Sequence, residues 1–268
     1  MDLSKVKLVV TDMDGTLLNS KGKVSSSFFE LFKQLQKNDV HFAAASGRQF
    51  QSISQKLHPI KNDISIIAEN GGIAKYKNQH LLINSLGLKK TLQLIPLLRN
   101  INDVYIVLCG EKGAYIETKD QDFITMFQEY YPEYFSLKDL SKVMKDTFFK
   151  IALYHYQNSE KYIYPSVKHL ENEFQIKVSG EHWVDISHPK ANKGVALKIL
   201  QDKLGIKKEE TMAFGDFNND LEMLELAHFS YAMENAHPNV KKVARFQTKS
   251  NNDEGVEIIL EKLLKAKS

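Results

Sequence analysis

Cysteine is nearly absent from this chain of 268 residues, and the single one, Cys109, excludes a framework of internal disulfide bonds. No apolar run approaches the ~20 residues that a membrane-spanning helix needs. The N-terminal residues lack the long apolar stretch and the small-residue cleavage site of a signal peptide. No membrane association is therefore expected, and a soluble cytoplasmic protein is the default prediction.

A large net charge is also missing. Lys and Arg number 36 against 33 Asp and Glu, which leaves a net charge of +3, and the two signs are interspersed. A nucleic-acid-binding protein more often shows a clustered basic face, so no nucleic-acid partner is expected. What is present is an ordinary globular composition, 43% hydrophobic and 26% charged. The length allows one large or two modest domains.

Short strands and helices alternate at both ends of the chain. Apolar runs typical of buried strands stand at 6–10, 40–46 and 64–68, separated by amphipathic segments at 25–38 and 49–57. Alternation resumes near residue 190, with helices expected at 193–205, 219–227, 238–244 and 255–266, and strands at 211–215, 229–233 and 245–248. This pattern predicts an α/β core, a doubly wound, Rossmann-like parallel sheet.

The middle of the chain breaks the alternation. Residues 73–83 have the pattern of a hairpin around Asn78. Beyond it, helices are expected at 120–131 and 158–174, and strands at 104–109, 114–118, 148–156, 175–179 and 183–187. Hairpin-like neighbours without strand–helix alternation predict an antiparallel α+β domain, here called the insert. We expect the core to comprise residues 1–83 and 190–268, and the insert residues 84–189.

Polar motifs stand at the ends of several predicted core strands. They are 12-DMDGT-16, 46-SGR-48, 69-ENGG-72 and 215-GDFNND-220, with Lys193 at a helix start just before the last. Ligands of open α/β sheets bind beyond the carboxyl ends of the strands. Carboxylates from two strand ends repel each other unless they bind a cation, and their hard oxygens suit Mg²⁺. Asp12 and Asp216 are the candidate ligands.

A carboxylate in such a site can also attack phosphorus and form an aspartyl-phosphate. Its approach to a phosphate dianion requires nearby positive charge and N–H donors. Lys193 can supply the charge, and Ser46 with Gly47 can bind phosphate oxygens at a helix N-terminus. The sequence therefore holds the parts of a phosphoryl-transfer site.

Each part also has a purely structural interpretation. The stretch from Asp12 to Thr16 could form an Asx-turn, and Ser46 could be an ordinary helix N-cap. Lys193 alone is more often a solvated residue at a helix start, and residues 216–220 could cap a helix. Capping alone hardly explains all four in this order, each at or just before the expected end of a core strand.

The whole chain resembles the haloacid dehalogenase superfamily, in its Cof-like subfamily of phosphatases with the type IIB cap. The four family motifs correspond to 12-DMDGT-16, 46-SGR-48, Lys193 in 190-KANKGVAL-197, and 215-GDFNND-220. Further matches are 69-ENGG-72, 232-AMENAHPNVK-241 and 248-TKSNNDEGV-256. The insert stands where that family carries its cap, between the second and third motifs.

The resemblance implies a catalytic role for four residues. Asp12 would be the nucleophile that accepts the phosphoryl group. Asp14 would protonate the leaving alcohol and then activate the water that hydrolyses the aspartyl-phosphate. Ser46 would bind the phosphate, and Lys193 would neutralise nucleophile and phosphate together.

The resemblance also implies a magnesium site. Mg²⁺ would be held by Asp12, by the backbone carbonyl of Asp14 and by Asp216. Asn219 and Asp220 would support it, and Asn219 with Gly47 would also belong to the phosphate site. One departure is Asp185, where the family pattern leads us to expect glutamate.

The insert does not identify a substrate. Arg48 and Asn70 are candidate substrate contacts, and Glu111 and His182 are candidates from the insert, although each is more typical of a surface residue. Two tyrosine clusters, 154-YHY-156 and 162-YIY-164, could stack on a ring, but core packing is the simpler interpretation.

The sequence predicts a Mg²⁺-dependent phosphatase of small phosphorylated metabolites, such as sugar phosphates, acting as a monomer or homodimer. A hexose phosphomutase with the same cap type is one alternative. A non-catalytic protein that binds a phosphorylated ligand on this fold is the other.

Overall fold

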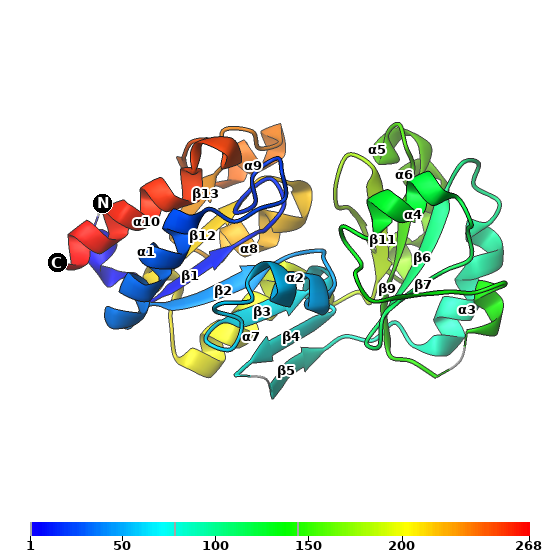
Figure 1. The fold of residues 1–268 in the computed structure, drawn as a ribbon, viewed down its shortest axis with the longest axis horizontal. Coiled ribbons are helices and arrows are strands. Elements are labelled where there is room, and N and C mark those ends of the chain that lie inside the picture. Colours follow the sequence, from blue (N-terminus) through cyan, green and yellow to red (C-terminus); the bar gives the residue numbers. More distant parts are fainter. Residues whose placement is uncertain (1, 78, 144) are drawn as a thin grey trace.

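The computed structural model describes residues 2–77, 79–143 and 145–268 (Figure 1). Among them, eight strands form one sheet in the order β14-β13-β12-β1-β2-β3-β4-β5. Their bounds are β1 Leu8–Thr11, β2 His41–Ala45, β3 Ser65–Ala68, β4 Ile73–Tyr76, β5 Gln79–Ile83, β12 Thr211–Gly215, β13 Phe229–Ala232 and β14 Phe246–Gln247. The strands from β14 to β3 are parallel, as predicted.

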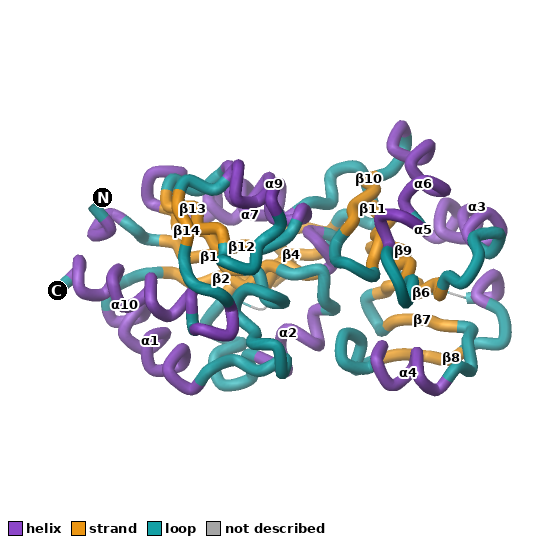
Figure 2. Tube along the Cα trace, turned by 90° about the horizontal axis from the view of Figure 1, so that it is seen from above, coloured by secondary structure: helices purple, strands orange, loops and turns teal. Residues whose placement is uncertain are grey.

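Helices cover both faces of this sheet, with α1, α2 and α10 on one face and α7 and α9 on the other (Figure 2). Their bounds are α1 Ser26–Lys37, α2 Phe50–Lys56, α7 Lys193–Leu204, α8 Leu221–Glu225, α9 Pro238–Val243 and α10 Gly255–Lys267. All four residues of β1 are buried because both faces of the strand meet helices. Burial on both faces explains why the core strands appear as continuous apolar runs in the sequence.

Helix α1 illustrates how local sequence produces a core element. Phe28, Leu31, Phe32 and Leu35 are buried on one face, at the spacing of a helical repeat. The hydroxyl of Ser25 accepts a hydrogen bond from the backbone N–H of Phe28 and caps the helix. The predicted helix is thus confirmed.

The parallel sheet continues into an antiparallel hairpin. Strand β4 pairs with β3 and with β5, as the hairpin prediction requires. The expected turn residue, Asn78, lies outside the described residues. Across the described ranges, no helix is both long and apolar enough to cross a membrane.

Between β5 and β12, the described residues form a second sheet of six strands, in the order β10-β11-β9-β6-β7-β8. Its elements are β6 Tyr105–Gly110, β7 Ala114–Ile116, β8 Tyr134–Ser136, β9 Phe148–Tyr154, β10 Gln175–Val178, β11 Trp183–Ser187, α3 Leu88–Leu98, α4 Gln121–Phe127, α5 Ser159–Tyr162 and α6 Tyr164–Val167. Neighbouring strands are antiparallel except for β7 and β8, which are parallel.

Three details of the insert differ from the sequence prediction. Helix α3 was not predicted, although Thr91, Leu94, Ile95 and Leu98 are buried at helical spacing. Strand β8 was not predicted either, because its residues are mostly exposed and its partner is distant in sequence. The helix expected over 158–174 breaks at Ile163 and restarts with Pro165 in its first turn, since proline cannot continue a helix interior.

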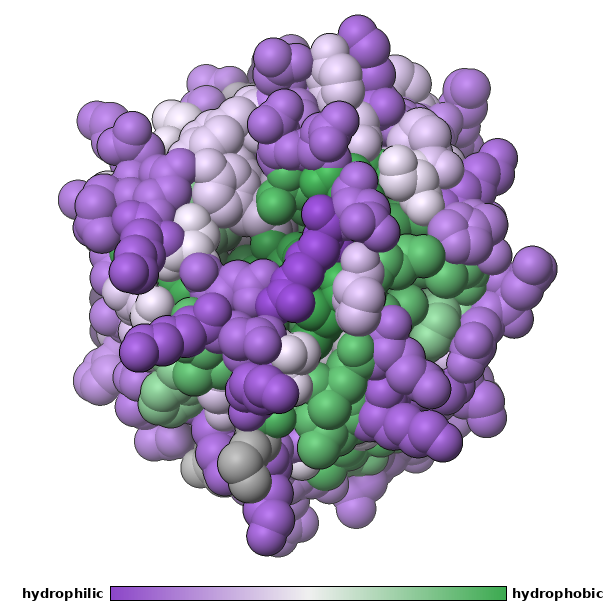
Figure 3. Space-filling model, turned by 90° about the vertical axis from the view of Figure 1, so that its right-hand side faces the viewer, coloured by the Kyte–Doolittle hydropathy of each residue, from purple (hydrophilic) through white to green (hydrophobic). Residues whose placement is uncertain are grey.

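The two faces of the second sheet have different partners. Ile151 and Leu153 of β9 share one hydrophobic cluster with helix α3, whereas Ala152 and Tyr154 share another with helix α4. Alternation along the strand places Lys150 on the same face as Ala152 and Tyr154. Seen from the end that carries this sheet, the rim is hydrophilic and apolar side chains appear in a central patch (Figure 3).

Candidate active site

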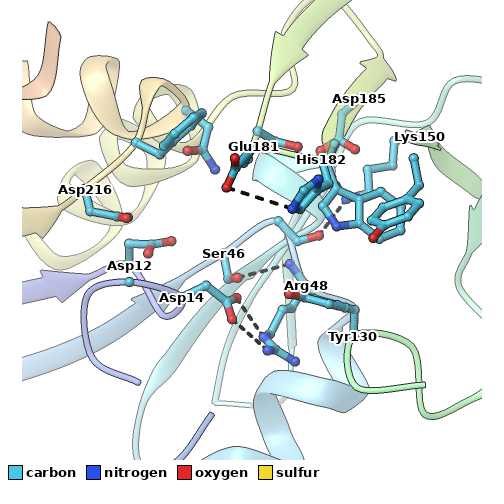
Figure 4. Close-up of a pocket in the computed structure, with 18 of the residues that line it drawn as sticks. Asp12, Asp14, Ser46, Arg48, Tyr130, Lys150, Glu181, His182, Asp185 and Asp216 are labelled. Carbon is cyan, nitrogen blue, oxygen red and sulfur yellow. Dashed lines mark hydrogen bonds and ion pairs between the residues drawn. The ribbon is translucent and has the colours of Figure 1, made fainter. Parts of the chain in front are cut away.

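A cavity of about 410 Å³ is lined by residues of both sheets (Figure 4). The core contributes loops at the carboxyl ends of β1, β2 and β12: Asp12, Asp14, Gly15, Ser46, Gly47, Arg48, Asp216, Phe217 and Asn219. The insert contributes Met126, Tyr130, Tyr131, Lys150, Tyr154, Ser179, Gly180, Glu181, His182, Trp183 and Asp185. The core side of the cavity is therefore mostly charged and polar, whereas the insert side combines several aromatic rings with ionisable residues.

A fully buried lysine lies behind the carboxylate of Asp12. Lys193 Nζ is 2.6 Å from Asp12 Oδ1 and 2.6 Å from Asp220 Oδ1. Burial alone would lower the pKa of Lys193, but the two carboxylates raise it above its ordinary value, so the ammonium stays charged. The solvated helix-start interpretation of Lys193 is wrong.

Asp220 is held inside the protein at both of its oxygens. Oδ1 accepts from Lys193, and Oδ2 accepts from the backbone N–H groups of Asp216 and Phe217. Its side chain therefore caps the loop after β12 and also positions the lysine.

Asp216 faces Asp12 across the turn at Gly15 (Figure 4). Thr16 Oγ1 donates to Asp216 Oδ1 at 3.3 Å. Gly15 has φ of +72°, and a Cβ atom there would stand 2.2 Å from Asp216 Oδ2. Only glycine allows the chain after β1 to turn this close to the second carboxylate.

The carboxylate oxygens at this point are suited to a hard divalent cation. One oxygen from each of Asp12, Asp216 and Asp220 lies within 4.8 Å of the others. Burial raises the pKa of Asp12 to about 7, opposed by Lys193 and reinforced by Asp220. Burial and the charge of Asp12 raise the pKa of Asp216 well above its ordinary value. Because Asp220 is fully engaged, Asp12 and Asp216 are the carboxylates left for a divalent cation, and these hard oxygen donors fit such an ion.

The predicted phosphate loop does not coincide with a helix cap. Helix α2 begins at Phe50 with Gln49 as its N-cap, so the placement of Ser46 and Gly47 at the helix N-terminus is wrong by three residues. The same geometry rules out the N-cap interpretation of Ser46. Instead, Ser46 Oγ accepts from the backbone N–H of Arg48 at 3.0 Å, and both Ser46 and Gly47 line the cavity.

Asp14 lines the cavity but turns toward Arg48 (Figure 4). Arg48 Nε and Nη2 each donate to the carboxylate at 2.7 Å, in a bidentate ion pair. Arg48 also donates to the backbone carbonyl of Glu129 and lies over the ring of Tyr130 at 4.6 Å. The arginine that the sequence proposed as a substrate contact thus links the acidic loop after β1 to the insert.

Asn70 does not line the cavity. Its Nδ2 donates to Asp185 Oδ2 at 2.5 Å, and its Oδ1 accepts from Asn219 at 2.9 Å. The backbone at Glu69 and Asn70 is left-handed, with φ of 52° at both residues. Strained backbone of this kind persists where surrounding contacts hold it in place. Here it directs the amide of Asn70 toward both Asp185 of the insert and Asn219 of the loop after β12. Asp185 reaches the amide although its side chain is shorter than that of the glutamate expected.

Lys150 forms a second buried ion cluster that joins the insert to the core. Its Nζ donates to the carbonyl of Gly47 at 2.6 Å and lies 3.2 Å from both Glu69 and Asp185. All three charged side chains are almost fully buried. Lys150 was not among the residues proposed from the sequence, although a lysine within the apolar run 148-FFKIALY-154 was an available signal.

The aromatic side of the cavity was also missed. Trp183 and Tyr130 were not proposed. Tyr154 packs in a hydrophobic cluster, as predicted, and all three residues line the cavity. His182, a proposed contact from the insert, lines it too, whereas Glu111 borders a separate small hollow.

Comparison with known proteins identifies the family. The profile of the haloacid dehalogenase-like hydrolases matches residues 9–260. One similar relative is 5-amino-6-(5-phospho-D-ribitylamino)uracil phosphatase YbjI of Escherichia coli (strain K12), 32% identical over 266 residues and covering 97% of each chain. The crystal structure of SMU.1108c from Streptococcus mutans UA159 superposes with a TM-score of 0.90 at 31% identity, covering 97% of this chain and 99% of that one.

The fold also matches that of a subclass IIB sugar phosphatase, BT4131, with a TM-score of 0.80 at 20% identity, over 96% of this chain and 98% of that one. The resemblance seen in the sequence motifs is confirmed: this chain belongs to the haloacid dehalogenase-like hydrolases.

Proposed function

We propose that this hydrolase is a Mg²⁺-dependent phosphatase of small phosphomonoesters that works through an aspartyl-phosphate. The observation that carries the proposal is Lys193, fully buried and 2.6 Å from a cavity-lining aspartate. Burying an ammonium and two carboxylates costs desolvation free energy. A positive charge kept at this place can neutralise an incoming phosphate, which gives the buried lysine a function. The curated relative named above is a phosphatase, which supports the same class of reaction.

In the first step Asp12 attacks phosphorus and the ester P–O bond breaks. Lys193 holds the attacking carboxylate and offsets the charge of the phosphate. Ser46 and the backbone of Gly47 bind phosphate oxygens from the loop after β2. Asp14 gives its proton to the departing alkoxide, so the alcohol leaves neutral.

In the second step water attacks phosphorus and the aspartyl P–O bond breaks. Asp14, now a carboxylate, takes the proton from this water, and Asp12 is regenerated as inorganic phosphate leaves. In its bidentate ion pair with Arg48 the Asp14 carboxylate has no proton to give, so Asp14 must leave Arg48 and take up a proton from solvent before the first turnover. In later turnovers the proton comes from the attacking water, and Arg48 positions Asp14 beside the cavity until substrate binds.

Asp12, Asp216 and the carbonyl of Asp14 would hold Mg²⁺, with Asn219 and Asp220 in support. When bound, Mg²⁺ supplies a Lewis acid that withdraws charge from the phosphate oxygens. The insert, residues 84–189, would act as the cap of a core formed by residues 1–83 and 190–268, excluding water from the cavity. A cytoplasmic location and a monomeric or homodimeric state stay predictions.

Phosphate release from p-nitrophenyl phosphate and from a panel of sugar phosphates tests the proposal, with Mg²⁺ and with a chelator. Asp12→Asn is the blank. We expect turnover that needs Mg²⁺ and is abolished in Asp12→Asn; full activity in that variant, or robust turnover with chelator, would refute the mechanism. A mutase would instead interconvert sugar phosphates without net phosphate release, and a binding protein would bind ligands without turnover.

A further inference from the structure

We propose that the alcohol portion of the substrate carries a planar heteroaromatic ring, which binds against an aromatic wall formed by Tyr130, Tyr154 and Trp183. The proposal rests on the phosphatase function for the phosphate end and adds the substrate class. The wall belongs to the insert, so it faces the phosphate site from the opposite side of the cavity.

The geometry of the insert assembles the wall. Trp183 of β11 pairs directly with Tyr154 of β9, so their side chains point to the same face of the sheet. Their ring centroids are 4.8 Å apart with planes at 59°. Tyr130, just after α4, approaches Trp183 edge to face at 5.8 Å. The three rings support one another at fixed angles, which produces a preformed apolar surface.

The wall is not an ordinary part of the hydrophobic core. Tyr154 is 5% exposed and belongs to a hydrophobic cluster, but Trp183 and Tyr130 are only half-buried, and all three line the cavity with the carboxylates. Large aromatic side chains left accessible in a concave site are typical of ligand-binding surfaces. In proteins that bind single-stranded nucleic acids, stacking of a base on an aromatic side chain strengthens binding by about tenfold or more.

Lys150 and Asp185 of the insert also line the cavity, but they are bound to each other and Lys150 to the core, so the remaining polar groups of the insert lie beside the wall. The turn between β10 and β11 brings Ser179, Glu181 and His182 to the cavity. Their acceptors and donors suit the N–H and C=O groups at the rim of a heterocycle. A bare sugar would present hydroxyls on most sides, whereas the ring faces of the wall offer no hydrogen-bond partners, and Arg48 lies over the ring of Tyr130. The cavity volume, about 410 Å³, admits a ring joined to phosphate by a short chain.

Paired substrates that differ only in the ring test the proposal. Flavin mononucleotide is compared with ribitol 5-phosphate, and adenosine 5′-monophosphate with ribose 5-phosphate. We expect kcat/KM to be at least about tenfold higher for the ring-bearing member of one pair. Trp183→Leu should reduce that ratio by about tenfold, and Trp183→Phe should retain most of it.

The matched control is Phe135→Leu, an exposed aromatic residue of the same sheet that does not line the cavity. It should leave the ratio unchanged. The inference is overturned if neither pair shows a preference for the ring, or if the ratio in folded Trp183→Leu equals that of the wild type.

Binding separates this inference from the phosphatase proposal. Trp183 is the only tryptophan of the chain, so its fluorescence reports on a ring that stacks there. In the Asp12→Asn variant we expect quenching by the ring-bearing compounds and none by their ring-free partners. Quenching without turnover in the wild type would refute the phosphatase proposal and support the ring site. Turnover without ring dependence would support the phosphatase proposal and refute the ring site.

Discussion

Glu69 provides a quantitative test of the buried ion cluster between the insert and the core. It shares the ammonium of Lys150 with Asp185, and it is 1% exposed. Neither of its carboxylate oxygens has a well-aligned hydrogen-bond partner among the described residues. Burial raises the pKa of Glu69 from 4.5 to about 7, opposed by Lys150 and reinforced by Asp185.

The sign of the effect on stability follows from proton binding. Between pH 4.5 and about 7 the folded protein keeps the Glu69 proton while the unfolded chain has lost it. The free energy of unfolding therefore falls as pH rises through this interval. At about 1.4 kcal/mol per pH unit, the ionisation of Glu69 costs about 3 kcal/mol by pH 8.

Glu69→Gln should remove this loss, because an uncharged amide replaces the protonated carboxyl. We expect the variant to match the wild type at pH 5 and to be more stable by about 3 kcal/mol at pH 8. Urea unfolding at several pH values measures the difference, with the exposed Glu261→Gln as control. A difference that does not change with pH, or a variant less stable at pH 8, would mean that ionised Glu69 binds Lys150 favourably.

Two further variants test the core of the site. Lys193→Met should abolish phosphate release and lower the free energy of unfolding by about 3–5 kcal/mol, because two buried carboxylates lose their cation. Lys198→Met, exposed on the same helix, should change neither quantity in the same assays. Gly15→Ala should lower both activity and the urea midpoint, since its Cβ would stand 2.2 Å from Asp216 Oδ2; wild-type phosphate release would contradict the geometry at that turn.

The sequence alone was sufficient to predict the strands and helices of the core, because strand–helix alternation is a local property of the chain. Buried parallel strands need continuous apolar runs, and their covering helices need one apolar face, so both patterns appear along the chain. The insert was harder to predict. Strand β8 gains its order from a distant partner, and Pro165 breaks what otherwise resembles one helix.

The candidate residues of the core site could also be predicted from the sequence. Parallel strands bring their carboxyl ends to one edge, so the order of the strands along the chain was enough to place Asp12, Ser46 and Asp216 together. The sequence could not indicate which charged residues of the site pair with each other. Asp14 pairs with Arg48, and Asp220 holds Lys193, because of distances that no spacing along the chain encodes.

Only the tertiary structure decided what faces the carboxylates. Alternation along β9 and β11 assigns Lys150, Tyr154 and Trp183 to one face of their sheet, but it does not specify what that face meets. In the folded protein the face is turned toward the core loops, so the lysine joins a buried ion cluster and the rings line the cavity. The apolar pattern of each strand is set by its own residues, whereas the partner of each face is set by how the two sheets pack.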